Sequence, residues 1–423
     1  MTQKRIKVLV LSDHPFSPSG VGTQTKYMIQ ALLESDKFDF ICLGGAVKHQ
    51  DYTPSKVEPW DDRFVIIPVD GYGSPDMIRS IMMNHKPDIL WFMTDPRFYG
   101  WLWEMEDEIR QHIPMVYYHV WDNYPYPKFN EKYYESNDLV VTISKLTSDI
   151  VRTVCPKVEE HYLPHSVNTD IFRKLPDDMV KPFRESLFEN AKNYNSDSTV
   201  FFWNNRNARR KLSGSVLWWF SEFLKEVGND KAALIMHTDP KDVHGQDLIA
   251  IMHRLGLTNG EVLLSTEKYP PEQLSMIYNA VDCTINVSDA EGFGLATFES
   301  LSCETPIIVS MTGGLQEQVT DGKNWFGIGL EPASKAIVGS QDVPYIYEDR
   351  VSGEDVIAAM KEIHEMGAEG RAALGKLGRE HVDNNYSYDQ YCRRWVKIML
   401  DVHDRCGSWE NRKNYDRWEL IEL

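Results

Sequence analysis

The sequence predicts an α/β protein of two domains, each built around a doubly wound, Rossmann-like parallel sheet. The chain has 423 residues, which exceeds one ordinary core and, at roughly 150 residues per domain, favours two large domains. Short apolar runs typical of buried strands alternate with segments long enough for helices, first in one half of the chain and then in the other. Such alternation is typical of parallel sheets covered by helices on both faces.

In the first half, the apolar run IKVLVL at 6–11 predicts a buried strand, which is followed by a loop to Gly22 and a helix over 23–33. The further strands that we predict are 38–43, 64–68, 89–93, 115–120 and 139–143.

After Phe172, a polar stretch that runs through Ser198 and contains Pro176 and Pro182 separates the two alternations. We therefore place the first domain at 1–175 and the second at 176–387. The predicted strands of the second domain are 200–203, 232–237, 262–264, 283–287 and 306–309. Its predicted helices are 215–227, 247–255, 271–280, 296–303, 315–320 and further segments from 353 onward. Two such domains facing each other would place a ligand crevice at the carboxyl ends of their strands.

The balance of charge limits the classes of partner. The chain has 45 Lys and Arg against 63 Asp and Glu, a formal charge of −18, which repels phosphate backbones and anionic lipids. The six cysteines form no C-x2-C pair, and no run of 18 apolar residues occurs. We therefore expect a cytoplasmic protein in a reducing setting, with no membrane span and no bulk nucleic-acid binding.

The motif with the most chemical content is SDAEGFGLATFE at 288–299. Its two glycines lie after a predicted strand and before a predicted helix, so backbone N–H groups at the helix N-terminus can bind an anion. The residues that offer these amides to a diphosphate or a sugar hydroxyl are Phe293, Gly294 and Leu295. Glu299, about one turn into the helix, can accept the hydroxyls of a ribose, and Glu291 can face a sugar. The alternative interpretation is an ordinary strand–helix turn.

This motif, with TPIIVS from Thr305 and GGLQEQVTDG from Gly313, resembles the E-x7-E region of the GT-B retaining glycosyltransferases of family 4, also called group 1. The resemblance extends over most of the chain. It implies the GT-B fold and an enzyme that transfers a sugar, with retention, from a nucleoside diphosphate sugar to a hydroxyl acceptor.

The basic turn in FFWNNRNARRK at 201–211 lies where that family has a strand, an arginine and a second cation five positions on. Arg206 and Lys211 match this spacing, and the resemblance makes them catalytic and diphosphate-binding residues. A guanidinium and an ammonium group can hold a diphosphate leaving group and neutralise its charge. Arg209 and Arg210 lie next to the lysine in the sequence, so the second diphosphate-binding cation is Arg209, Arg210 or Lys211. A solvated basic turn is the alternative.

Two further matches lie in the first half of the chain. Gly20 and Gly22 in SGVGT resemble the family's glycine loop, which lies under the donor phosphate. The motif lacks the third glycine of G-x-G-x-x-G, which disfavours a dinucleotide site. His119 ends a predicted strand where the family has a histidine near the transferred sugar. The aromatic-rich stretch 91–134 is our prediction for acceptor contacts.

Neither a D-x-D triplet nor a His/Cys cluster with metal-ligand spacing occurs, so we expect no metal and no cofactor, with cations and helix dipoles in their place. The expected partners are a nucleotide-sugar donor and an unidentified hydroxyl acceptor. Two alternatives stay open: a phage-type DNA-modifying glycosyltransferase acting on hydroxymethylated bases, and another nucleotide-sugar enzyme such as an epimerase. Nucleic acid is disfavoured by the charge but not excluded.

The C-terminal segment, about 388–423, carries apolar residues at helical spacing on one face. In proteins of the GT-B fold the final helix is similar to a strap that returns to the first domain. We therefore expect this helix to pack on the N-terminal domain.

Overall fold

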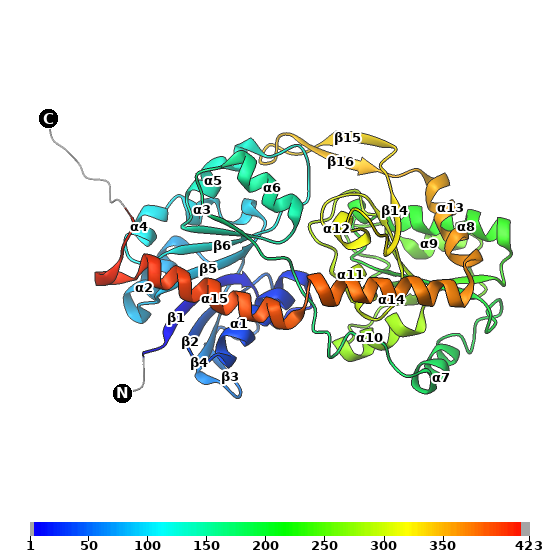
Figure 1. The fold of residues 1–423 in the computed structure, drawn as a ribbon, viewed down its shortest axis with the longest axis horizontal. Helices are drawn as coiled ribbons and strands as arrows, with labels where there is room; N and C mark the ends of the chain where they lie inside the picture. Colours follow the sequence, from blue (N-terminus) through cyan, green and yellow to red (C-terminus); the bar gives the residue numbers. More distant parts are fainter. Residues whose placement is uncertain (1–3, 416–423) are drawn as a thin grey trace. The chain divides into compact units, whose positions relative to one another are not determined.

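The computed structural model describes residues 4–415 and divides into two compact units (Figure 1). The first unit comprises the chain up to Trp121, Tyr126–His165 and the chain from Asp389 onward. The second comprises Asp122–Pro125 and Ser166–Tyr388. Residues 166–175, which the sequence analysis assigned to the first domain, thus belong to the second unit.

An eight-stranded sheet forms the centre of the first unit, in the order β3-β4-β2-β1-β5-β6-β7-β8. Its strands are β1 Ile6–Asp13, β2 Phe38–Gly45, β3 Ser55–Val57, β4 Asp61–Pro68, β5 Ile89–Thr94, β6 Met115–His119, β7 Leu139–Thr142 and β8 Glu160–Tyr162. All neighbours pair in parallel except β3 and β4. The carboxyl ends of the parallel strands therefore lie at one edge of the sheet.

The helices of the first unit are α1 Gly20–Glu34, α2 Pro75–His85, α3 Gly100–Trp103, α4 Glu106–Arg110, α5 Glu131–Glu135, α6 Lys145–Val154 and, from Asp389 onward, α15 Tyr388–Cys406. Three short 3₁₀ turns lie at Pro96–Phe98, Lys128–Asn130 and Trp409–Asn411.

The C-terminal helix α15 runs along the first sheet (Figure 1). Trp395 is fully buried, and its ring packs edge to face against Trp91 at 5.9 Å and against Tyr118 at 4.9 Å between ring centroids. The hydroxyl of Tyr391 donates to the carbonyl of Gln24. The apolar face of α15 is therefore part of the core of the first unit. Residues 416–423 of the predicted helix lie outside the described residues.

A six-stranded parallel sheet forms the centre of the second unit, in the order β11-β10-β9-β12-β13-β14. Its strands are β9 Thr199–Asn204, β10 Ala232–His237, β11 Val262–Ser265, β12 Cys283–Asn286, β13 Ile307–Ser310 and β14 Gly327–Leu330. Its helices are α7 Asp177–Leu187, α8 Ser213–Val227, α9 Leu248–Leu255, α10 Pro271–Ala280, α11 Leu295–Ser302, α12 Leu315–Val319, α13 Gly353–Glu365 and α14 Gly367–Asn385, and a 3₁₀ turn lies at Arg209–Lys211.

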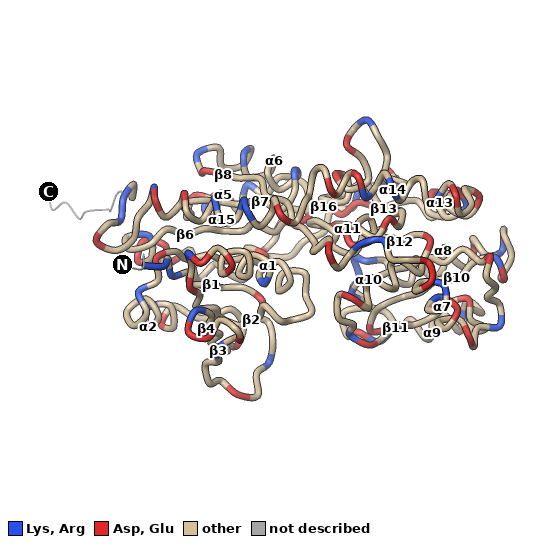
Figure 2. Tube along the Cα trace, turned by 60° about the horizontal axis from the view of Figure 1, so that its bottom comes forward, with Lys and Arg blue, Asp and Glu red and all other residues tan. Residues whose placement is uncertain are grey.

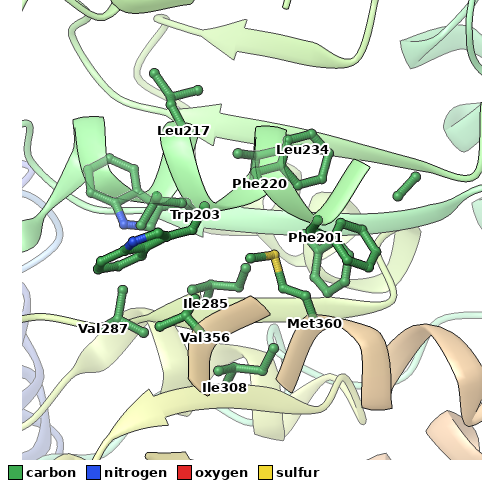
Figure 3. Packing of buried hydrophobic residues seen from close by; sticks show 14 of the residues in the cluster. Phe201, Trp203, Leu217, Phe220, Leu234, Ile285, Val287, Ile308, Val356 and Met360 are labelled. Carbon is green, nitrogen blue, oxygen red and sulfur yellow. The ribbon is translucent and has the colours of Figure 1, made fainter. Parts of the chain in front are cut away.

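The core on one face of this sheet is dense and rich in aromatic residues (Figure 3). Phe201 and Trp203 of β9 pack with Phe220 of α8, and Met360 of α13 closes the same cluster. Both β9 residues are fully buried. This packing holds the strand whose carboxyl end carries the basic turn.

Several elements were not predicted from the sequence, among them the short strands β3, β8 and β14, the helix α7 and a hairpin. The polar stretch that we took as a connection contains α7, whose acidic first turn suits a helix N-terminus. Arg184 of α7 donates to the carbonyl of Ser198 at 2.7 Å and to the carboxylate of Asp282 at 2.8 Å, which ties the helix to the sheet. An antiparallel hairpin, β15 Ser334–Val338 with β16 Ile346–Arg350, follows β14.

Acidic and basic residues are interspersed along both units (Figure 2). Within residues 4–415, no helix has both the length and the apolar character that crossing a membrane requires.

Candidate active site

The candidate site of the second unit lies where β9 and β12 end. These strands are parallel neighbours, with Cys283 opposite Phe201 and Thr284 opposite Phe202. Since their carboxyl ends share one edge of the sheet, the basic turn after β9 and the loop 287–294 after β12 come together there. We call the loop 287–294, which contains Gly292 and Gly294, the glycine loop of the second unit.

The centre of this site is an ion pair between Lys211 and Glu291. The two side chains are 8% and 13% exposed. Burial and the neighbouring charge of Arg210 lower the pKa of Lys211, and Glu291 acts in the opposite direction. Burial alone would raise the pKa of Glu291, but the charges of Lys211 and Arg210 outweigh it and lower that pKa. Buried ionisable groups with such perturbed pKa values cluster at functional sites.

The three adjacent cations of the turn have different partners. Lys211 pairs with Glu291. Arg210 donates to the carbonyl of Ala290 at 2.5 Å and lies 3.4 Å from the carboxylate of Asp122, which belongs to the same unit. Arg209 forms a bidentate pair with Glu348 at 2.7 and 2.5 Å. Of the three, Lys211 is therefore the cation that directly contacts the glutamate of the motif.

Arg206 lies apart from this pair. Its side chain is 61% exposed, and its guanidinium binds the carboxylate of Asp242 at 2.7 and 3.2 Å. The physical reason is the buried Asn207, whose amide donates to the carbonyl of Gln246 at 2.7 Å and so holds the loop after β10 beside the turn. Arg206 and Lys211 thus contact different carboxylates in this structure.

The glycine loop is pressed against the loop before α12. Gly294 has a φ of +93°, and a Cβ there would lie 2.5 Å from Leu315. A Cβ on Gly313 would lie 1.7 Å from the carbonyl oxygen of Glu291. Gln318 of α12 donates to the carbonyls of Phe293 at 2.7 Å and Gly294 at 3.1 Å. The loop is therefore fixed by packing on both sides.

Helix α11 begins at Leu295, directly after this loop. The N–H groups of its first turn have no intrahelical acceptor, and they give this end of the helix a partial positive charge. The side chain of Phe293 is buried against Phe298, with ring centroids 5.3 Å apart. Phe293 can thus serve a ligand only through its backbone.

Glu299 lies on α11 and reaches the end of β9 through two other residues. The hydroxyl of Tyr278 donates to its carboxylate at 2.7 Å, and the amide of Asn204 donates to the same Tyr278 oxygen at 2.8 Å. Burial raises the pKa of Glu299 to about 7, while the Tyr278 hydrogen bond acts in the opposite direction. Asn204 and Tyr278 were not identified from the sequence. Asn204 precedes the basic turn directly, but no local pattern marks Tyr278.

Gly20 and Gly22 lie in the first unit at the N-terminus of α1, which begins three residues earlier than we predicted from Thr23. The Ser19 hydroxyl accepts the N–H of Gly22 at 3.0 Å and donates to the carboxylate of Asp13 at 2.6 Å. A Cβ on Gly22 would lie 2.7 Å from the carbonyl oxygen of His14. Position 22 thus requires glycine, because any side chain there would collide with the backbone of His14.

His119 is fully buried at the end of β6. Its ring nitrogens lie 3.0 Å from the hydroxyl of Tyr134 and 3.3 Å from that of Tyr117. Burial lowers the pKa of His119 to about 3. The ring therefore lies in the interior of the first unit, where aromatic side chains cover it, and its predicted contact with a sugar stays a prediction.

Most of the aromatic-rich stretch 91–134 is likewise involved in packing. Phe92 stacks on Tyr117 with centroids 4.9 Å apart, and Trp103 stacks on Tyr133 at 4.6 Å. Within the part of the chain that the structure covers, no group of three or more His, Cys, Asp or Glu could hold a metal ion.

Residues 248–338 match the family model described as glycosyl transferases group 1. The matched segment contains both Glu291 and Glu299. D-inositol 3-phosphate glycosyltransferase from Segniliparus rotundus is 27% identical over 135 residues, which are 32% of this chain and 27% of that protein. The enzyme of the same name from Acidothermus cellulolyticus is 40% identical over 68 residues, 16% of this chain and 15% of that protein. The alignments thus span about a quarter or less of these curated relatives.

Similarity to solved structures extends over nearly the whole chain. Sucrose-phosphate synthase from Thermosynechococcus elongatus has a TM-score of 0.73 and 15% identity, and covers 95% of this chain and 100% of its own. HepE from Anabaena, in complex with UDP-glucose, has a TM-score of 0.66 and 15% identity, and covers 94% of this chain and 100% of its own. At this identity the likeness concerns the fold.

Proposed function

We propose that this chain, which has the GT-B fold and whose residues 248–338 belong to the glycosyl transferases group 1 family, transfers a sugar from a nucleoside diphosphate sugar to a hydroxyl acceptor, with retention at the anomeric carbon. The observation that carries the proposal is the buried Lys211–Glu291 pair next to the N-terminus of α11. It places a cation, a carboxylate and helix amides around one point, as the transfer of a sugar from a diphosphate requires.

For the donor, we assign the nucleotide to α11 and its neighbours. Glu299 accepts the two ribose hydroxyls, with Tyr278 holding its carboxylate in place. The first amides of α11 bind the diphosphate, which the partial charge of a helix N-terminus favours. The UDP-glucose in the HepE complex supports a nucleoside diphosphate sugar as the class of donor.

For the chemical step, Lys211 stabilises the charge that develops on the diphosphate as the glycosidic bond breaks, and Glu291 orients the sugar. An oxygen of the leaving diphosphate removes the acceptor proton on the same face, so no protein nucleophile is needed. Arg206 can bind the diphosphate only if its ion pair with Asp242 breaks. Because the Arg206 side chain is largely exposed, breaking this pair costs little free energy.

No divalent metal takes part in this proposal, because Lys211, Arg206 and the helix dipole neutralise the diphosphate. The Gly20–Gly22 turn opens α1, whose N-terminus is a second anion-binding element, on the first unit. It is our candidate for a contact with the donor phosphate.

The experiment that tests this function is a donor screen followed by product analysis. Thermal shifts with UDP-, GDP- and ADP-sugars select the donor, since a ligand at 100 times its Kd stabilises by about 2.7 kcal/mol. Transfer is then measured with inositol phosphates, the acceptor class named in the curated relatives, and with simple sugars. Absence of both a thermal shift and nucleoside diphosphate release with every donor would exclude the proposal.

A further inference from the structure

The hairpin β15–β16 is bound to the same loop that carries Glu291. The backbone N–H of Asp349 in β16 donates to the carbonyl of Asp289 at 2.9 Å. The hydroxyl of Thr312 donates to the carboxylate of Asp349 at 2.6 Å. The family match ends at residue 338, so β16 lies beyond it. This strand therefore contacts the candidate site from outside the matched segment.

Glu348 of β16 connects the two halves of the site. Its side chain is 5% exposed. Its carboxylate accepts both terminal nitrogens of Arg209, from the basic turn after β9, and one nitrogen of Arg350 at 3.0 Å. Arg350 in turn pairs with Asp289, two positions before Glu291. One carboxylate thus holds the turn on one side and, through Arg350, the glycine loop on the other.

The geometry makes this a positioning contact. A bidentate guanidinium–carboxylate pair fixes orientation as well as distance, which a single hydrogen bond does not. Arg209 precedes Lys211 by two residues, as Asp289 precedes Glu291 by two. The N–H of Asp289 also donates to the carbonyl of Arg210 at 2.8 Å, so a backbone hydrogen bond joins the turn to the loop close to the ion pair.

We propose that Glu348 is a positioning residue of the transferase site, an inference that rests on the function proposed above. It holds Arg209 and Arg350 and so keeps Lys211 and Glu291 in register when the donor binds. Glu348 does not contact the substrate and acts through Arg209. Its removal therefore affects the rate of transfer and leaves the nucleotide affinity nearly unchanged, because Glu299, α11 and Arg206, on which that affinity depends in our proposal, are not held by Glu348.

The test compares Glu348→Gln, Arg209→Gln and the double variant with the wild type. The matched control is Asp342→Asn, an exposed carboxylate in the loop of the same hairpin. We measure kcat and KM for UDP-glucose, or for the donor that the screen selects, the Kd of UDP by calorimetry, and the Tm. Because Arg209 is 62% exposed, water can solvate its freed guanidinium and Glu348→Gln still folds.

We expect Glu348→Gln to lower kcat by about 10- to 100-fold, the usual effect of a misplaced catalytic group. The Kd of UDP stays within about twofold, Asp342→Asn behaves as the wild type, and the double variant is no slower than the slower single variant.

Unchanged kcat in Glu348→Gln, or losses that multiply in the double variant, would overturn the inference. Parallel losses of kcat, UDP affinity and Tm would also overturn it, since they indicate a structural role. A wild type that turns over no donor would instead refute the proposed function and the inference with it.

Discussion

The hydroxyl of Tyr278 lies 2.7 Å from the carboxylate of Glu299 and donates a hydrogen bond to it. The same tyrosine oxygen accepts from Asn204 at the end of β9. Glu299, on α11, is thus held against the end of a strand nearly a hundred positions earlier in the chain. This arrangement fixes one edge of the proposed nucleotide site before any ligand binds.

The first prediction concerns this carboxylate. Glu299→Ala should weaken UDP binding by roughly 1.5–3 kcal/mol, the contribution of a charged hydrogen-bond partner. Tyr278→Phe should have a smaller effect, about 0.5–1.5 kcal/mol, because it removes only a neutral donor to the carboxylate. Calorimetric titration of both variants measures these losses. Wild-type affinity in Glu299→Ala would show that Glu299 does not bind the ribose.

The second prediction is a dependence of UDP affinity on pH. Since the pKa of Glu299 is raised to about 7, the protonated group dominates below that pH and cannot accept from both ribose hydroxyls. UDP affinity should therefore rise as the pH increases through about 7, and Glu299→Gln should lack this step. Calorimetry across that interval tests it, and an identical profile in the variant would assign the step to another group.

The same raised pKa also makes the free energy of unfolding depend on pH. Whereas UDP affinity should rise with increasing pH, this contribution to stability should fall. The folded state binds the Glu299 proton more tightly than the unfolded state does. The contribution of this group to the free energy of unfolding is thus present below the ordinary glutamate pKa of 4.5 and is lost as the pH rises to about 7. UDP, which favours the ionised form, should offset that loss.

The third prediction addresses Arg206. If its pair with Asp242 competes with the diphosphate, Asp242→Asn should tighten UDP binding by about 0.2–1 kcal/mol, the range for an exposed ion pair. Arg206→Ala should weaken binding, and adding Asp242→Asn to it should change nothing more. Unchanged affinity in Asp242→Asn, with normal binding by Arg206→Ala, would remove Arg206 from the diphosphate site.

The fourth prediction is that turnover survives chelation. In the proposed mechanism Lys211, Arg206 and the helix N-terminus neutralise the diphosphate, and EDTA should leave the rate of donor consumption unchanged. The assay compares rates with EDTA alone and with excess Mg²⁺ or Mn²⁺. A rate that falls with EDTA and returns with the metal would contradict this part of the account.

Local sequence signals predicted the central strands of both sheets and the loop–helix motif at 288–299, because apolar runs and glycines act through neighbouring residues. The strands β3, β8 and β14, which lie at or near the sheet edges, were not predicted. The two-sheet α/β class and the GT-B fold are confirmed. Contacts between distant segments could not be predicted in this way. Asp242 pairs with Arg206 where Asn207 holds the loop after β10, and His119 is enclosed by tyrosines of its own strand and of α5.

The hairpin β15–β16 shows the same limit. Its strands are short and mix polar with apolar residues, and its pairing with the site depends on Arg209 and Asp289, which lie far away in the sequence. No periodicity within 334–350 reveals that Glu348 contacts the basic turn.

The measurement that tests the central claim most directly is analysis of the product formed by the wild type and by Glu291→Gln. With the donor selected by the screen and an accepted hydroxyl compound, the anomeric coupling constant in the NMR spectrum gives the configuration of the new bond. We predict that the wild type forms a product with the configuration of the donor, and that Glu291→Gln binds UDP normally but transfers far more slowly. An inverted product, or undiminished transfer by Glu291→Gln, would contradict the account.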